Sequence, residues 1–516
     1  MPAGLALAAG LFGFVLLPLA ALVARATREA GTLSTTSGDV SGDALWRSLC
    51  LSLELGLGAA LVAVVAGLAW ALLSELAELP GRRLWRGAAL LPVALPPFLP
   101  TLAAIELFGA SGTPTSGLAA EWLYSRTSCC LLLGFGAFGL VSLPTGACLS
   151  RLTREQVEAA DLGRGRLGIV LTTLRAARPG LLLGASLVFV MTLIRFATPL
   201  LLRIDALPQL VHARFASFRD VPGAVRAMIP LLVLAATAGA LVAWRLRDFE
   251  LRDGGSGRPW RPLRSRAARA LVMIALLLLL LPPLWLPLAV LTRALLAAPE
   301  LDQLGLIGLV RQSLATPADL GATLIAAFGA AGVVWLFGWL AALARPDRGS
   351  AGPIWWTLLT ALAAVPGPIL GIGLVLLWHR PGLPFLVYDS PAILIVAALG
   401  RTLPAGLLVS FALLARHPQS EDEAAELAGR SPLALAGRLR EHGLAAALVF
   451  VLTVGEYGAS SLITPPGWSP LAVKVVNLVH FGRTGETGVL ALLLALLALG
   501  PGLALAAAAG GPRDAA

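Results

Sequence analysis

Long apolar runs, separated by short polar segments, make up most of this chain of 516 residues. The runs are solid rather than alternating between polar and apolar positions, which excludes an outer-membrane β-barrel. A helix of about 20 apolar residues spans a hydrocarbon layer of ~30 Å, so the pattern predicts an all-α polytopic membrane protein with about 12 transmembrane helices. The expected spans are 4–24, 49–74, 86–109, 130–150, 180–202, 227–246, 269–292, 318–344, 353–378, 390–415, 443–463 and 488–509.

The first run has a second interpretation, because Ala24-Arg25-Ala26 resembles the cleavage site of a secretory signal peptide. No basic segment precedes the run, however, since the chain starts Met1-Pro2-Ala3-Gly4. The run also resembles the one at 269–292. We therefore interpret it as an uncleaved helix.

The chain is an internal duplication, because landmarks recur in the same order in both halves. Each half holds six runs, so the two repeats share one orientation and relate by an axis along the membrane normal. We expect a first module at 1–246, a linker at 247–268, a second module at 269–516, and a translocation path between the modules. The paired landmarks are Leu187-Val188-Phe189-Val190-Met191-Thr192 with Leu448-Val449-Phe450-Val451-Leu452-Thr453, Pro96-Pro97 and Pro100 with Pro366 and Pro368, Leu143-Pro144 with Leu403-Pro404, and Trp46-Arg47-Ser48-Leu49 with Val310-Arg311-Gln312-Ser313-Leu314.

Composition supports the membrane interpretation. The chain is 57% hydrophobic and 13% charged, whereas a soluble globular chain is about 25% charged. The net charge of +10 comes almost wholly from arginines between the runs. We interpret these arginines as signals that hold loops in the cytoplasm, rather than as a nucleic-acid-binding surface.

The Arg- and Gly-rich linker is the strongest of these topological signals. Placing it in the cytoplasm predicts that both chain termini are cytoplasmic as well. Arg25 and Arg28 then fall on the opposite side, which disagrees with the rule. The loops expected in the cytoplasm are 75–86, 151–178, 345–350 and 416–442.

Two short charged segments lie between apolar runs at matching places in the two halves. One reads Glu158-Ala159-Ala160-Asp161-Leu162-Gly163, and the other reads Glu423-Ala424-Ala425-Glu426-Leu427-Ala428-Gly429. Glu and Ala favour helix and Gly ends or turns it, so each segment predicts a short helix across the cytoplasmic face of the membrane. One copy alone is typical of an ordinary amphipathic loop helix, but two matched copies indicate a contact surface for a partner.

These segments resemble the Glu-Ala-Ala-x-x-x-Gly signature of permease subunits of binding-protein-dependent ABC importers. The second copy matches it fully and the first is one residue short. The Leu-Pro that often follows the signature is absent, with Arg178-Pro179 as the nearest remnant. The resemblance covers nearly the whole chain, which looks like the fused permeases of the ferric iron and thiamine importers. The matching residues are Glu423, Ala424, Ala425 and Gly429, and in the first copy Glu158, Ala159, Ala160 and Gly163.

The resemblance implies a transport permease of a bacterial inner (plasma) membrane, not an enzyme. The two segments would be coupling helices seated on two cytoplasmic ATP-binding cassette ATPase subunits. Those subunits hold the ATP, and the chain itself would bind no cofactor. An extracytoplasmic solute-binding protein would deliver the solute: ferric iron first, then thiamine, with phosphonates and polyamines left open. The chain lacks a Gly-x-x-x-x-Gly-Lys-[Ser/Thr] segment and its single lysine is Lys474, so it cannot itself be the ATPase.

One charged residue follows the repeated Leu-Val-Phe-Val sequence in each half. Arg195 and Glu456 have the same offset from it, and both lie in otherwise apolar runs, where an unpaired charge is expensive. We expect them to face each other near the central axis, as a gate ion pair or in a polar cavity, with Tyr457 contributing a hydroxyl. The alternative is that each lies near a helix end and snorkels to water.

The loops that follow, 203–226 and 464–486, each contain a proline near the same point, Pro208 or Pro470, and a basic residue. The topology places both loops outside. We expect short interfacial helices or dips that dock the binding protein, or else plain amphipathic loops on the membrane surface.

Two other classes of protein remain open. A secondary transporter also uses duplicated helical bundles, and intramembrane carboxylates such as Glu456, Glu54 and Glu106 would favour it. A membrane-embedded enzyme, such as a lipid-modifying transferase, would need clustered polar residues at one membrane face. The five histidines are scattered along the sequence, and we expect no metal site.

Overall fold

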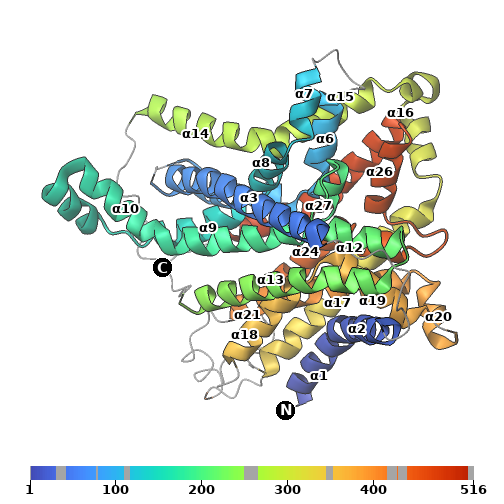
Figure 1. Cartoon of the computed structure of the whole chain (residues 1–516). Coiled ribbons are helices and arrows are strands. Elements are labelled where there is room, and N and C mark those ends of the chain that lie inside the picture. Colours follow the sequence, from blue (N-terminus) through green and yellow to red (C-terminus); the bar gives the residue numbers. More distant parts are fainter. Residues whose placement is uncertain are drawn as a thin grey trace.

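The computed structural model describes residues 2–30, 42–76, 79–109, 117–248, 265–344, 352–379, 381–414, 427 and 439–509. Within these ranges the chain is helical and forms no strand (Figure 1). Eight helices are long and apolar enough to cross a membrane, or up to eleven spans if each bent pair counts as one. The expectation of an all-α polytopic membrane protein is therefore confirmed.

The helices overlap the predicted spans, some closely and others with shifted or broken ends. In the first half they are α1 (Pro2–Leu11), η1 (Phe12–Leu16), α2 (Leu17–Ala30), α3 (Gly42–Leu76), α4 (Arg82–Ala88), α5 (Leu91–Ala94), α6 (Phe98–Phe108), α7 (Gly117–Leu123), α8 (Arg126–Ala137), α9 (Gly139–Leu149), α10 (Arg154–Leu193), α11 (Ala197–Leu201), α12 (Leu207–Ala216) and α13 (Val221–Asp248). In the second half they are α14 (Arg266–Leu280), η2 (Leu281–Trp285), α15 (Leu286–Leu296), α16 (Pro299–Ser313), α17 (Pro317–Ala344), α18 (Gly352–Ala363), α19 (Gly367–Trp378), α20 (Leu383–Tyr388), α21 (Ala392–Leu414), α24 (Leu439–Val454), α25 (Ser460–Ile463), α26 (Leu471–His480) and α27 (Thr484–Ala509).

Prolines break the third and ninth predicted spans. The chain bends by 75° between α5 and α6 and by 89° between α18 and α19. Leu95, which precedes Pro96, has the extended ψ of 131°, as a residue before proline prefers. Pro366 is extended as well, with ψ 142°. Each break points two helix ends into the interior of the bundle.

Three further predicted spans are wrong as continuous helices, the first being 130–150, which bends by 48° between α8 and α9. The span at 180–202 ends at Leu193 and the span at 443–463 ends at Val454. The predicted loop at 151–178 is also mainly helical, because α10 runs through it from Arg154. Thr153 and Gln156 start this helix with a capping box, in which each side chain accepts a bond from the other's backbone N–H.

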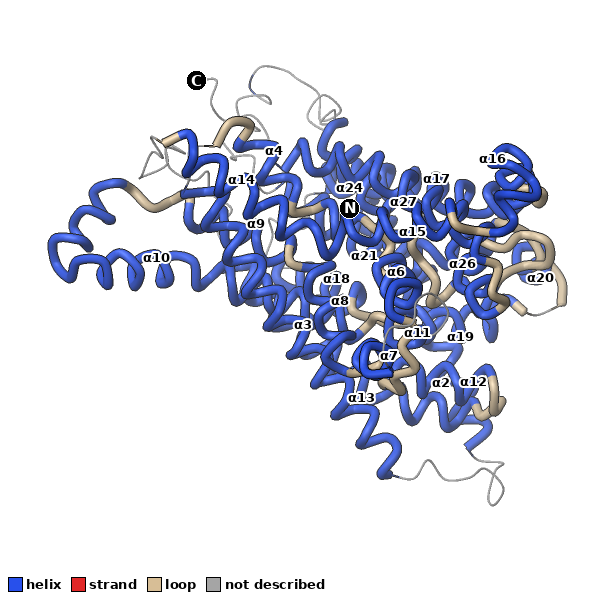
Figure 2. Tube along the Cα trace, turned by 90° about the horizontal axis from the view of Figure 1, so that it is seen from above, coloured by secondary structure: helices blue, strands red, loops and turns tan. Residues whose placement is uncertain are grey.

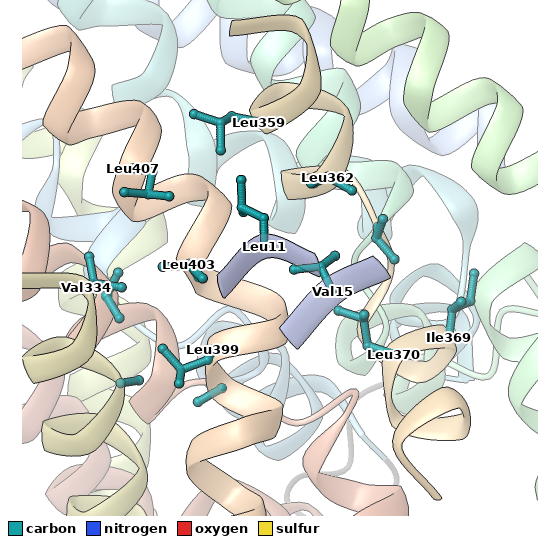
Figure 3. Close-up of a cluster of buried hydrophobic side chains, with 14 of the residues drawn as sticks. Leu11, Val15, Val334, Leu359, Leu362, Ile369, Leu370, Leu399, Leu403 and Leu407 are labelled. Carbon is teal, nitrogen blue, oxygen red and sulfur yellow. The ribbon is translucent and has the colours of Figure 1, made fainter. Parts of the chain in front are cut away.

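The first helix of each half packs on the opposite half. In the first half, α1 contacts α17, η1 contacts α21 and α2 contacts α19. In the second half, η2 contacts α8 and α15 contacts α6. Figure 3 shows Leu11 and Val15 lying among side chains of α18, α19 and α21. The two halves therefore share their hydrophobic cores.

Glycines allow this close approach. A Cβ atom on Gly400 of α21 would lie 2.9 Å from the carbonyl oxygen of Phe14, and one on Gly373 of α19 would lie 2.5 Å from that of Pro18. Both distances are shorter than a Cβ tolerates, so a larger residue would push the first helix away. Phe14 lies in η1, which replaces the regular α-helix by one π-helical turn, and Pro18 lies at the start of α2.

Short helices occupy part of each of the loops 203–226 and 464–486, and their docking of a binding protein stays a prediction. α12 and α26 dock on the bundle through matching bonds: the backbone N–H of Leu207 donates to Ser52 Oγ at 2.8 Å, and that of Leu471 donates to Thr323 Oγ1 at 2.8 Å. Lys474 of α26 also pairs with the buried carboxylate of Asp319 at 2.7 Å. These helices are tied to the core rather than resting loosely on it.

Candidate functional site

The helices α10 and α24 break at the same place in the two halves. Each helix carries the repeated Leu-Val-Phe-Val sequence, and each ends a few residues after it. Arg195 and Phe196 follow α10 in irregular backbone, and Glu456 and Tyr457 follow α24 in the same way. No proline lies at either break. The sequence repeat thus produces a structural repeat at the two charged residues.

Hydrogen bonds satisfy the backbone at both breaks. The N–H of Arg195 donates to the carbonyl of Thr192 at 3.1 Å, and the N–H of Glu456 donates to the equivalent Thr453 at 3.0 Å. The side chain of Gln209 donates to the carbonyl of Phe196 at 2.7 Å. Because buried backbone groups are expensive to leave unpaired, these bonds hold the irregular segments in place.

Four of the helix breaks, those after α5, α10, α18 and α24, meet at one cavity of about 60 Å³. Its lining includes Arg195, Glu456 and Tyr457 with Arg401 of α21, and Gly367 at the start of α19. The break between α5 and α6 contributes Pro97 and Phe98. A cavity of this volume has room for more than one water molecule. The sequence-predicted residues Arg195, Glu456 and Tyr457 are thus brought together.

The ion pair in this cavity joins Glu456 to Arg401. Arg401 Nε lies 3.8 Å from Glu456 Oε2, and both side chains are more than four-fifths buried. Arg195 lines the same cavity and interacts electrostatically with both groups. Glu456 Oε1 accepts a bond of 2.9 Å from the N–H of Ala459, which fixes the carboxylate. Arg401 donates to the carbonyl of Ala363 at 2.9 Å, at the end of α18.

An aromatic pair joins the two breaks beside the charges. The rings of Phe196 and Tyr457, neighbours of Arg195 and Glu456, stack with centroids 5.8 Å apart and planes 12° from parallel. The ring of His212 of α12 also packs against Phe196, with centroids 4.9 Å apart. The stack links α12 to the point where the two halves meet.

Arg401 was missed by the sequence interpretation. Its equivalent in the first half, counted from Leu143-Pro144 and Leu403-Pro404, is the apolar Val141, so the repeat gave no paired signal. The available signal was a single arginine inside the predicted span 390–415. Intramembrane arginines are rare enough to mark functional sites by themselves.

The first signature segment begins α10, which projects from the rest of the molecule as a bent hairpin (Figures 1 and 2). Glu158 is exposed and pairs with Arg154 one turn earlier, at 2.6 Å. The same part of α10, before Gly165, contains Ala159, Ala160 and Gly163. Leu162 is 90% exposed, which is unusual for a large apolar side chain. The segment is helical, as predicted, and its place at the cytoplasmic face stays a prediction.

Gly165, rather than Gly163, makes the turn in this segment. Gly165 has φ 58° and ψ −147° inside α10, a conformation that is essentially limited to glycine. Gly163 is helical and a Cβ atom on it would meet nothing within 4 Å. The expectation that Gly163 ends the helix is therefore wrong by two residues.

The second signature segment lies mostly outside the described residues. This applies to Glu423, Ala424, Ala425 and Gly429, and to the loop 416–442 except for Leu427 and the start of α24. Leu427 stands at the same offset from its Glu-Ala-Ala as Leu162, and it is 89% exposed. The two copies therefore each present one leucine almost fully to the surroundings.

Replacing Gly165 by alanine is expected to distort the hairpin, whereas Gly163→Ala is expected to be neutral or slightly stabilising. Alanine at a backbone conformation outside its allowed range costs about 1–3 kcal/mol, while alanine in an exposed helix gains up to ~1 kcal/mol over glycine. Limited proteolysis of the projecting hairpin, compared between the two variants in detergent, measures the difference. Faster cleavage of the Gly163 variant would contradict the assignment of the turn.

In comparisons with known proteins, the chain matches no protein-family model, no curated protein and no solved structure.

Proposed function

We propose that the chain is the transmembrane permease of an importer, driven by two separate ATP-binding cassette ATPase subunits. The observation that carries the proposal is the meeting of the equivalent breaks after α10 and α24 at one charged cavity. A path between two repeats needs polar groups at its middle. Irregular backbone within a bundle is tolerated where it is buried in protein or lines a cavity.

Two parallel six-helix modules account for the paired features. Counting each bent pair as one span and adding the shorter apolar helix Glu441–Val454 gives the twelve expected segments. Each half begins with a helix containing a π-helical turn, η1 or η2, and each has one short docked helix, α12 or α26. The modules would be 1–246 and 269–516. The linker 247–268, proposed to be cytoplasmic, lies mostly outside the described residues.

The projecting signature segments support ATPase coupling. The exposed helix with Glu158, Ala159 and Ala160 lies far from α12, α16 and α26, at the opposite end of the molecule (Figure 2). This separation fits a bundle that meets ATPase subunits at its cytoplasmic end and a solute-binding protein at its external end. The matching contact in the second half would be made by Glu423, Ala424, Ala425 and Gly429. The proposed location is a bacterial inner membrane, with both termini cytoplasmic.

The test is purification from native membranes followed by reconstitution. We expect an ATP-binding subunit to co-purify with the chain, and solute uptake into proteoliposomes to require hydrolysable ATP on the cytoplasmic side. A non-hydrolysable ATP analogue is the control. Uptake that is driven by an ion gradient in the absence of nucleotide would identify a secondary transporter instead, and would overturn the proposal.

A further inference from the structure

The cavity at the helix breaks contains more positive than negative charge. Arg195 and Arg401 line it against the single carboxylate of Glu456. In the described part of the chain, no ion pair is formed by Arg195, while Glu456 pairs with Arg401 at the loose distance of 3.8 Å. Among the described residues, one positive charge in a largely buried site therefore lacks a counter-ion of its own, and a buried charge is expensive unless it is paired or wet.

The backbone adds to this positive character. The helices α6 and α19 both begin at the cavity, where Phe98 and Gly367 line it. The N-terminal end of a helix carries a partial positive charge. Apart from Glu456, few groups in the lining could hold a cation, since Tyr457 and Thr198 are the other side chains with oxygen atoms.

We infer that this cavity binds an anionic group of the transported solute, such as a phosphate, sulfate or carboxylate, between Arg195 and Arg401. The inference rests on the proposed transport function and names its substrate class. A planar guanidinium binds such oxyanions through two parallel hydrogen bonds. Glu456 is then the internal counter-ion that holds Arg401 while the solute is absent, and an entering anion competes with it for Arg401.

The inference changes the choice of solute that the family resemblance suggested. A free ferric ion or the thiamine cation would meet a net positive site and gain little from it. Iron would fit only as a complex with an anionic chelator. The Arg195–Arg401 pair favours anions whatever protein delivers the solute.

The inference is tested by whether removing each charge weakens or strengthens anion binding. Purified chain in detergent is titrated with sodium phosphate, sodium sulfate or sodium citrate at constant ionic strength, with thiamine hydrochloride as the cationic probe, and binding is followed as a rise in melting temperature. We expect at least one of the three anions to stabilise the protein saturably, and thiamine to leave it unchanged. Arg195→Gln and Arg401→Gln should each weaken that binding by about tenfold or more, the value of a charge-assisted hydrogen bond.

Glu456→Gln should act in the opposite direction. The substitution removes the carboxylate that competes for Arg401, so the apparent Kd of the variant for the anion should fall. The glutamine keeps an oxygen that can accept from the N–H of Ala459. Without anion, the variant should melt at a lower temperature than the unmodified chain, because the ion pair is lost. Arg126→Gln, at the exposed pair with Glu54, is the matched control and should bind the anion as the unmodified chain does. Three results would each overturn the inference: thiamine stabilises the protein, none of the anions does, or an anion stabilises the Arg195→Gln variant as much as the unmodified chain. None of these outcomes bears on whether an ATPase subunit co-purifies.

Discussion

Arg401→Glu and Glu456→Arg are each expected to abolish transport, and the two together are expected to recover part of it. Each single reversal places two like charges at the loose 3.8 Å contact between α21 and the break after α24. Breaking a buried ion pair costs about 3–5 kcal/mol, and we expect the lower end here because the pair is longer than a hydrogen bond. The double variant restores opposite charges. Recovery stays partial, since a glutamate at position 401 cannot donate to the carbonyl of Ala363.

Melting temperature in detergent and uptake into proteoliposomes measure this cycle. The matched control is the same exchange at Glu54 and Arg126, whose side chains are 50% and 63% exposed. An exposed pair contributes about 0–1 kcal/mol, so each of its reversals should be nearly silent. A second cycle exchanges Arg195 with Glu456. If that cycle recovers more than the Arg401 cycle, Arg195 is the working partner of Glu456 and the assignment of the pair is wrong.

The sequence predicted some spans well, where a solid apolar run coincides with one unbroken helix. The ends of α17 and α21 lie within two residues of the predicted 318–344 and 390–415. Proline pairs also marked the breaks in the third and ninth spans. The breaks at Arg195 and Glu456 carry no proline or comparable signal. They depend on bonds formed beyond the helix ends, such as the one from Gln209 of α12 to the carbonyl of Phe196 and the local one from Ala459 to Glu456.

The candidate site was predictable where the repeat doubled the signal. Arg195 and Glu456 were found because they share one offset from a repeated sequence. Arg401 has an apolar equivalent, Val141, and its role depends on the distance to Glu456, which no sequence pattern contains. Gly165 was missed for a related reason, because Gly163 and Gly165 each lie one residue away from the glycine position of the family spacing. Only the backbone angles identify which glycine makes the turn.

Leu162→Asp combined with Leu427→Asp is expected to release the ATPase subunits and stop transport while leaving the permease folded. The two leucines are 90% and 89% exposed, so neither supports the fold, and exposed substitutions change stability by about 0.5 kcal/mol or less. On the proposed function, each leucine is the apolar centre of a contact whose charged rim includes Glu158 or Glu423. Such buried anchors contribute about 2 kcal/mol or more each to an interface.

The loss of two anchors predicts a decrease of more than a hundredfold in ATPase affinity, since about 1.4 kcal/mol is tenfold. The co-purified ATPase, the ATP-dependent uptake and the melting temperature are measured on one preparation. Ile307→Asp is the matched control: Ile307 is 72% exposed on α16, at the other end of the molecule (Figure 2). The single Leu427→Asp variant should be more damaging than Leu162→Asp, because the second signature copy is the complete one. Equal losses of bound ATPase in the two single variants would contradict the ranking of the two copies. An intact complex in the double variant would show that the two leucines do not contact an ATPase.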